Sequence, residues 1–338
     1  MHRRITSGSL AALNIGPGDE VITTPLTFCA TVNVIAQTGA KPVLADIGPD
    51  LNISPDAVRS RINRRTRAII PVHIAGLPCD LHAIWGLARE YGLKVIEDAA
   101  HAAGALYQGM HIGTGQSDAV AFSFYANKNL TTAEGGMVTS PHADLIDRMR
   151  ILSLHGISKD AWRRYSKQGT WYYEVTECGF KYNMPDILAA IGIHQLRKLE
   201  EMTMRRIAIA HTYNSAFSDM PELELPPDQS DSRHCWHLYI LRLHLDKLEA
   251  DREAFFSEMR AHGVGCSVHF IPVQLHPYYR NLMDTDPCPR SLAEYRRLIS
   301  IPLYPAMSDA DVNFVIATVK NVVAKLRTRN RVFVPELV

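Results

Sequence analysis

The stretch "FSFYANKNLTTAEGG", residues 122–136, decides the fold and poses the functional question. An aromatic run that favours a β-strand, residues 122–125, stops at the polar elbow Ala126-Asn127-Lys128-Asn129, and a polar loop with a Gly-Gly pair follows. Most loop lysines point into water. A lysine at the end of a buried strand can instead be a nucleophilic amine in a pocket. The surrounding sequence must decide between these two interpretations.

Short β-rich runs precede and follow this stretch. The predicted strands are "EVITT" (20–24), "KPVLADI" (41–47), "RAIIPVH" (67–73), "KVIED" (94–98), "AVAFSFY" (119–125) and "GMVTS" (136–140). Several are continuously apolar, which is typical of strands that are covered on both faces.

Helix signals lie between the predicted strands. Ser54-Pro55-Asp56 is a helix start with proline in the first turn, and the helical pattern from Asp80 ends at Gly92. Strands that alternate with helices predict an α/β fold with a mostly parallel sheet. Functional groups in such sheets gather at the carboxyl ends of the strands, where Asp98 and Lys128 both fall.

The second half predicts one long helix and then a smaller α+β domain. The helix opens at 184–186 with an apolar stripe of Met184, Ile187, Leu188, Ile191, Leu196 and Leu199. Strands are predicted over 235–243 and 266–270, a helix over 251–263, and a last helix from Ser308, where Asp311 completes a capping box. We expect a large domain over 1–225 and a small one over 226–338, with the boundary near the Pro-rich stretch 224–233.

Composition limits the classes of protein to which the chain can belong. The chain has 338 residues, 46% of them hydrophobic and 21% charged, and a formal net charge of +1, which gives no electrostatic reason to expect nucleic acid or an anionic membrane as partner. The six cysteines are scattered without a C-x-x-C pair, which argues against a metal site or a disulfide framework. No run approaches a membrane span or a signal peptide, so we expect a cytoplasmic protein.

A second motif, "VIEDAAHAAGA" (95–105), suggests a cofactor. Small residues after a strand-end carboxylate let a flat ring approach, and pyridoxal phosphate (PLP) needs a carboxylate at its ring nitrogen and a lysine at its aldehyde. Its phosphate needs hydroxyl and N–H donors, and Ser123 is one candidate. Taken singly, Asp98 could equally be a helix cap, His101 a core histidine and Ser123 an ordinary strand hydroxyl.

Taken together, the motifs resemble the DegT/DnrJ/EryC1/StrS sugar aminotransferases. The resemblance rests on "IEDAAHAAGA" (96–105), "FSFYANKNLTTAEGGMVTS" (122–140) and "GFKYNMPDILAAIGIHQLRKLEE" (179–201), with "IGPGDEVITTPLTFCAT" (15–31), "GAKPVLADI" (39–47) and "IIPVHIAGLPCD" (69–80) in the same order. It implies the type I PLP-dependent transferase fold, like that of aspartate aminotransferase. Within the family the chain looks most like aminotransferases of UDP-linked 4-keto-pentoses (the aminoarabinose branch).

The resemblance also implies roles for single residues. Lys128 would bind the aldehyde of PLP and later shuttle a proton, and Asp98 would pair with the pyridinium nitrogen. Phe28 would stack on one ring face and Ala100 would lie on the other. His101 would lie near the ring hydroxyl, where many relatives have glutamine, and Ser123 would hold the phosphate. For Phe28 a place in the core is the alternative.

The family implies an obligate homodimer with shared sites. Asn183 corresponds to an asparagine that reaches the phosphate of the neighbouring subunit, although its position before a helix also fits a cap. The implied reaction moves an amino group from L-glutamate to a nucleotide-linked keto sugar in two half-reactions. His269, Tyr172 and Tyr173 are weaker candidates for the sugar or uridine pocket, and ordinary interdomain packing explains them equally well.

The start of the chain departs from the family pattern. Ser7-Gly8-Ser9 resembles a Ser-Gly-Thr motif that donates to the PLP phosphate, but it lies closer to Gly16 than in the family. We therefore expect a shortened amino terminus, with Ser7 to Ser9 in a reduced version of that role. Two alternatives remain open, a truncated or non-catalytic relative and a PLP enzyme that acts on an amino acid. The presence of Lys128 argues against the non-catalytic relative, and the loop matches argue against the second.

Overall fold

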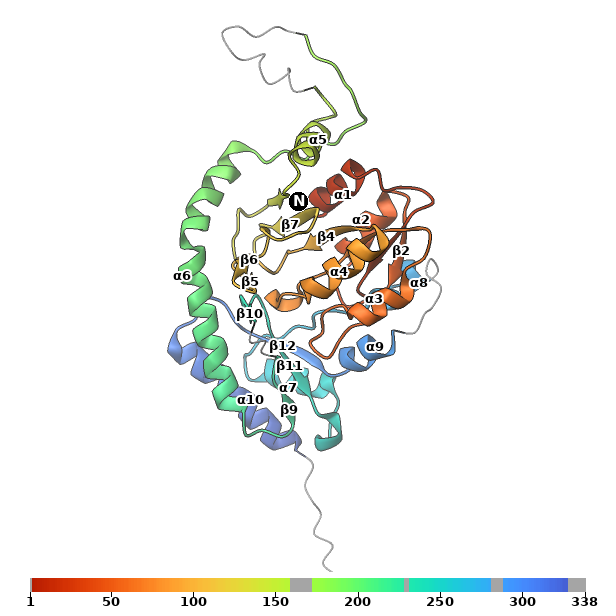
Figure 1. The fold of residues 1–338 in the computed structure, drawn as a ribbon. Helices are drawn as coiled ribbons and strands as arrows, with labels where there is room; N and C mark the ends of the chain where they lie inside the picture. The colour runs from red at the N-terminus through yellow and green to blue at the C-terminus, as the bar shows by residue number, and fades with distance from the viewer. Residues whose placement is uncertain (1, 159–171, 228–230, 281–287, 328–338) are drawn as a thin grey trace, which may run out of the picture.

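The computed structural model describes residues 2–158, 172–227, 231–280 and 288–327, and its large sheet has the predicted α/β architecture (Figure 1). Six strands lie in the order β2-β1-β3-β4-β7-β8, all parallel except β8, which runs antiparallel to β7. The six predicted strands of the first half are thereby confirmed, each shorter than or equal to its expected range. Their bounds are β1 (Glu20–Thr23), β2 (Lys41–Leu44), β3 (Thr66–Ile70), β4 (Lys94–Asp98), β7 (Ala119–Ser123) and β8 (Gly136–Thr139).

Helices cover both faces of this sheet, as the apolar strands predict. On β1, Val21 packs in a cluster with Leu10 of α1 (His2–Ala12) and Ile35 of α2 (Ala30–Gln37). The next residue, Ile22, packs in the cluster of the opposite face, which includes residues of α3 (Pro55–Arg61) and α4 (Leu81–Tyr91). The alternation continues along β3, β4 and β7, so two helical layers bury the sheet between them.

The ends of α3 and α4 follow the sequence signals. The Ser54 hydroxyl accepts a hydrogen bond from the amide of Ala57, and Pro55 occupies the first turn of α3. Asp80 caps α4 through the amide of Ala83. Gly92 ends α4 with φ of 67°, in the left-handed region that residues with a side chain rarely adopt.

The carboxyl-terminal part forms a second sheet in the order β12-β11-β9, all antiparallel. The strands β9 (Leu223–Glu224), β11 (Tyr239–Leu243) and β12 (Leu298–Ile301) pack with α7 (Arg252–Ala261) and α10 (Asp309–Leu326). The Ser308–Asp311 capping box opens α10 as predicted. The same core includes Ile209 and Phe217, near the end of the long helix α6 (Asp186–Phe217).

One strand prediction in this part is wrong, and a second is confirmed only over its last residues. Residues 266–270 form no strand: Ser267 makes one bridge to Ser300, and the following residues, His269 and Phe270, turn towards a cavity in the large sheet. The run 235–243 becomes a strand only at Tyr239. Before it, the amides of Cys235 and Leu238 bond the loop at 75–76 instead of a neighbouring strand, so tertiary contacts override the local pattern.

Smaller elements complete the described fold. A hairpin of β5 (Leu106–Tyr107) and β6 (Met110–His111) pairs with β10 (Ser232–Arg233), and residues 228–230 of the expected domain boundary lie outside the described residues. The remaining helices are α5 (Ala143–Ser153), α8 (Pro277–Arg280) and α9 (Pro289–Tyr295), with single turns at Ile74–Gly76, Leu245–Lys247 and Val273–Leu275. Among the described helices, none is both long and apolar enough to cross a membrane.

The long helix α6 runs along one side of the molecule, from the end near α5 to α10 (Figure 1). Its two halves differ in burial. In the first half Ile187 and Leu196 of the predicted apolar stripe are 77% and 62% exposed, whereas Tyr213 and Phe217 near its end are fully buried. Met184 and Leu199 of the same stripe pack against a buried cluster, so the stripe is covered only in part. Its exposed residues, Ile187, Ile191 and Leu196, form an apolar surface of the kind that marks an interaction site.

Candidate active site

Most of the predicted site residues line one cavity of about 520 Å³. The cavity lies where β4 and β7 end, and residues after β1 and from the carboxyl-terminal part close it. A pocket at the carboxyl ends of parallel strands is the position expected for a ligand in this class of sheet. Its described lining residues include Phe28, Asp98, Ala100, His101, Ser123, Lys128 and His269, all singled out from the sequence, and also Thr27, Thr31, Tyr125, Glu134, His237 and Phe270.

Lys128 lies on the elbow that follows β7. The turn is closed by its own amide, which donates to the carbonyl of Tyr125 at 3.0 Å, and its side chain reaches the cavity. Burial lowers the pKa of Lys128 to about 8, and the negative charge of Asp98 offsets part of that effect. The amine is therefore available as a nucleophile and base at mildly alkaline pH, which an ordinary surface lysine is not.

Hydrogen bonds from Thr31 and Ala100 help to hold Asp98 in place. Its side chain is 3% exposed, and it accepts from the Thr31 hydroxyl at 2.8 Å and from the amide of Ala100 at 3.1 Å. Thr31 in turn bonds the hydroxyl of Thr27 at 2.8 Å. The loop after β1 thus orients a buried carboxylate. The bond from the Ala100 amide is the local contact that the alternative of a helix cap for Asp98 predicted.

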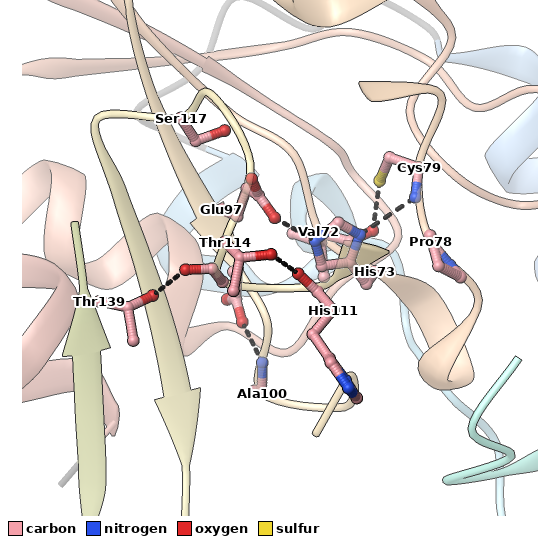
Figure 2. A network of polar contacts seen from close by, with 12 residues as sticks. Val72, His73, Pro78, Cys79, Glu97, Ala100, His111, Thr114, Ser117 and Thr139 are labelled. Atoms are coloured by element: carbon pink, nitrogen blue, oxygen red, sulfur yellow. Dashed lines mark hydrogen bonds and ion pairs between the residues drawn. The ribbon is translucent and has the colours of Figure 1, made fainter. Parts of the chain in front are cut away.

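A buried network behind Asp98 fixes the end of β4 (Figure 2). The imidazole of His73 lies 2.9 Å from the carboxylate of Glu97, and its other nitrogen accepts from the amide of Cys79 at 3.0 Å. The backbones of the two strand ends are joined as well, because the amide of Asp98 donates to the carbonyl of Pro71 and that of His73 to the carbonyl of Asp98. This network restricts the strand end that carries the cavity's carboxylate.

The shape of the cavity suits a flat heteroaromatic ring. The side chain of Phe28 is 57% exposed although it lines the cavity, which excludes the alternative that it is a core residue. Ala100 supplies a small face, and His101 stacks on Phe270 with ring centroids 5.8 Å apart and an angle of 24°. A lysine amine, a buried carboxylate, an open aromatic face and small neighbours are the groups that PLP requires. The residues present therefore fit PLP.

The candidate phosphate ligands are only partly in the cavity. Ser123 lines it, is 4% exposed, and accepts a long bond of 3.4 Å from the amide of Tyr125. Ser7 and Ser9 are buried on α1 and are not among the described residues that line the cavity. Their expected contribution to phosphate binding stays a prediction.

Three predicted residues lie outside this cavity in the single chain. Asn183 precedes α6 and accepts a hydrogen bond from the Lys181 amine. Tyr172 and Tyr173 are 54% and 47% exposed. None of the three is among the described lining residues of the cavity. Their predicted roles involve a second subunit or the substrate.

Several lining residues were not predicted from the sequence, and Thr31 and His237 are the most informative of them. Thr31 belongs to "LTFCAT", but nothing in that motif shows that its hydroxyl meets Asp98, 67 positions further on. The Nε2 atom of His237 lies 3.5 Å from the Lys128 amine, although its motif "WHLY" reads as the start of a strand. Only long-range folding places these residues, so spacing along the chain could not reveal them.

Comparison with known proteins agrees with this site. The fold is similar to that of the PLP form of the putative sugar aminotransferase Spr1654 from Streptococcus pneumoniae, with 32% identity, 97% of this chain and 86% of that chain covered, and a TM-score of 0.87. The fold and the cavity are those of a PLP-dependent transaminase, as expected. The profile of the DegT/DnrJ/EryC1/StrS aminotransferase family matches residues 7–320, and the chain belongs to that family.

Two further relatives match over nearly the whole chain. An uncharacterized protein of Methanocaldococcus jannaschii, MJ1066, is 51% identical over 322 residues, which are 94% of this chain and 83% of that protein. The spore coat polysaccharide biosynthesis protein SpsC of Bacillus subtilis is 48% identical over 319 residues, 93% of this chain and 82% of SpsC. The family and its relatives identify a sugar aminotransferase, and the alternative of a non-catalytic relative is not supported.

Proposed function

We propose that the protein moves an amino group from L-glutamate to the keto group of a 4-keto sugar linked to UDP or dTDP. One observation carries the proposal: Lys128, with an amine whose pKa is lowered to about 8, lines the same cavity as the buried carboxylate Asp98. When bound there, PLP supplies an electron sink that stabilises negative charge on the carbon next to the transferred nitrogen. Binding the cofactor, orienting it and moving the proton are the roles that we propose for side chains of the protein.

Each lining residue then has a task. The Lys128 amine binds the cofactor aldehyde and afterwards carries a proton between two carbon atoms. Asp98, held by Thr31 and Ala100, bonds the ring nitrogen and keeps a proton on it. Phe28 covers one face of the ring.

The other contacts fix the position of the cofactor ring. Ala100 lies on the face opposite Phe28, His101 contacts the ring hydroxyl, and Ser123 donates to the phosphate. Together these residues exclude water from the reacting side and fix the direction in which the lysine approaches.

The substrate class rests on the relatives. SpsC is by its name a polysaccharide biosynthesis protein, and the family is one of sugar aminotransferases. The loop 128–136 and the segments 236–243 and 267–270 support a 4-keto-pentose on UDP, as in the resemblance to the aminoarabinose branch. His269 lines the cavity, and we propose that it contacts the sugar. Tyr172 and Tyr173, which lie outside the cavity in the single chain, are weaker candidates.

We also propose a homodimer with shared sites. The exposed apolar stripe on the first half of α6, with Ile187, Ile191 and Leu196, needs a cover, and a second copy of the chain supplies one with the same stripe. Asn183, at the start of that helix, would then lie near the cavity of the partner and bond the phosphate there. Of the predicted phosphate ligands only Ser123 is among the described lining residues of the cavity, which supports a contribution from the partner.

The division into a large domain of 1–225 and a small one of 226–338 remains part of the proposal, as does a cytoplasmic location. The carboxyl-terminal core draws on α6 as far back as Ile209. We therefore propose that α6 links the two domains, with its buried end belonging to the smaller one.

The test is an assay of both half-reactions. Purified protein with PLP is incubated with L-glutamate and either UDP- or dTDP-linked 4-keto sugars, and both 2-oxoglutarate and the amino sugar are measured. We expect equal amounts of the two products and ping-pong kinetics. Formation of 2-oxoglutarate without any amino sugar, over a panel of keto sugars and keto acids, would contradict the sugar substrate.

A further inference from the structure

Lys128, His237 and Asn129 form a closed triangle of contacts on the wall of the cavity. The Nε2 atom of His237 is 3.5 Å from the Lys128 amine, and its Nδ1 atom is 3.1 Å from the side-chain oxygen of Asn129. Asn129 directly follows Lys128 on the elbow, so the imidazole of His237 contacts both residues of this consecutive pair. Both His237 and Asn129 are buried, at 6% and 5% exposure.

The amide of Asn129 has one possible orientation. Its nitrogen donates to the carbonyl of Cys235 at 3.1 Å and lies 3.5 Å from that of Ala103. The reverse orientation would place the amide oxygen against two carbonyl oxygens, which repel it. The oxygen of Asn129 therefore faces His237, and the Nδ1 atom of His237 must carry the proton that it accepts.

The tautomer of His237 follows from that bond. With the proton on Nδ1, Nε2 presents a lone pair towards the Lys128 amine. A second proton on the ring would place two positive groups in contact. Burial, and then the charges of Lys128, Arg206 and His269, hold the pKa of His237 well below its usual value, so the ring stays neutral and acts as an acceptor.

We propose that His237 is a positioning residue for Lys128, that its Nε2 accepts an N–H of the amine, and that Asn129 fixes the tautomer needed for this bond. The proposal rests on the role of Lys128 in the proposed function. A neutral amine has two N–H groups and one lone pair. When one N–H is held by His237, the lone pair can no longer rotate freely, and the cofactor and substrate carbons meet a preoriented nucleophile.

The contact of 3.5 Å is long for a hydrogen bond, and such contacts at catalytic groups tighten when the ligand is bound. The acceptor stabilises the ammonium form more than the neutral amine. Its loss should therefore lower the pKa of Lys128 further below about 8. The other titratable groups that line the cavity, which must stay unchanged in the test, are Asp98, His101, Tyr125, Glu134 and His269.

Two substitutions of His237 that differ by one methylene group test whether an acceptor at the position of Nε2 is needed. His237→Gln places an amide oxygen near the former Nε2 position, whereas His237→Asn reaches only as far as the former Nδ1 position. The matched control is His234→Asn. His234 is equally buried, at 6% exposure, lies three positions before His237, and is not among the described residues that line the cavity.

The first readout uses the protein without PLP. The rate at which an acylating reagent labels Lys128 is followed against pH by peptide mass spectrometry, and gives the pKa of the amine. We expect the midpoint of His237→Gln and of His234→Asn to stay near that of the wild type. The midpoint of His237→Asn should fall by about one unit.

The second readout is the rate at which added PLP is captured, followed by its visible absorbance. At a pH above the midpoints of all the proteins, where the amine is neutral in each, capture should slow by roughly ten-fold in His237→Asn and stay within about three-fold of the wild type in His237→Gln. Equal midpoints and equal capture rates in both variants would overturn the proposal. If the wild type captures no PLP, the proposed function fails instead, while the titration of Lys128 still decides the role of His237.

Discussion

Lys128 and Asp98 line the same cavity, but their surroundings act on them in different ways. Asp98 lies at the end of a strand and accepts hydrogen bonds from the Thr31 hydroxyl and the Ala100 amide. Lys128 lies on a loop, faces the neutral imidazole of His237, and has its pKa lowered by burial. One group is fixed by bonds, and the other is adjusted mainly by desolvation.

The difference fits the tasks proposed for the two groups. A residue that holds a proton on a ring nitrogen must keep its charge and position through the whole reaction, and hydrogen bonds provide both. A nucleophile must be neutral and able to move between partners, which burial provides and strong bonds would prevent. Substitutions at each group, and at what surrounds it, test this contrast.

The largest effect is expected for Lys128→Ala. Transamination should fall by at least about 10³-fold, because the nucleophile and the proton carrier are lost together. The assay is the formation of 2-oxoglutarate from L-glutamate. Lys94→Ala is the control, since Lys94 pairs with Asp118 on the surface, outside the cavity. A Lys128→Ala protein with activity near that of the wild type would refute the role of the lysine.

Asp98→Asn should have the second largest effect. The amide keeps the size of the side chain but cannot keep a proton on the ring nitrogen through its charge, so kcat should fall by roughly 10²-fold. Visible absorbance with added PLP should persist, because Lys128 is intact. Loss of cofactor binding with an unchanged kcat per bound cofactor would show that Asp98 only shapes the cavity.

Thr31→Val should act more weakly and through Asp98. Valine removes the donor to Asp98 and the bond to Thr27, and we expect kcat to fall by roughly ten-fold, the scale of one lost charge-assisted hydrogen bond. Thr31→Ser retains the hydroxyl and serves as the matched control. Equal kinetics in the two variants would mean that the backbone alone orients the carboxylate.

The smallest effect links the two groups. The negative charge of Asp98 raises the pKa of Lys128 against the effect of burial, so Asp98→Asn should move the midpoint for labelling of Lys128 below about 8. The direction is fixed, because removing a nearby negative charge destabilises the ammonium form. Glu90→Gln is the control, since Glu90 lies on α4 in a surface pair with Arg59, outside the cavity. An upward shift in Asp98→Asn would contradict the geometry.

Much of the large sheet could be predicted from local sequence. Continuous apolar runs, the cap at Ser54 and the glycine at Gly92 specify strand and helix locally, and the structure follows them. The prediction failed where long-range contacts decide, as at residues 266–270, which make one bridge and then enter the cavity wall.

The candidate site also contains residues that local sequence predicted and residues that only long-range contacts bring together. Asp98 and Lys128 could be predicted because they follow adjacent parallel strands, which brings their ends together. Thr31 and His237 could not, because each meets its partner only through folding of segments that lie 67 and 109 positions away in the chain. The role proposed for Asn183 requires a second subunit, which the pattern within one chain does not describe.

The most direct measurement is to identify the lysine to which PLP attaches. The protein is mixed with PLP, the bond is reduced with borohydride, and the labelled peptide is found by mass spectrometry. We expect label at Lys128 alone, and we expect preincubation with L-glutamate to abolish it. Stoichiometric label at another lysine, or none in a folded protein, would contradict the account.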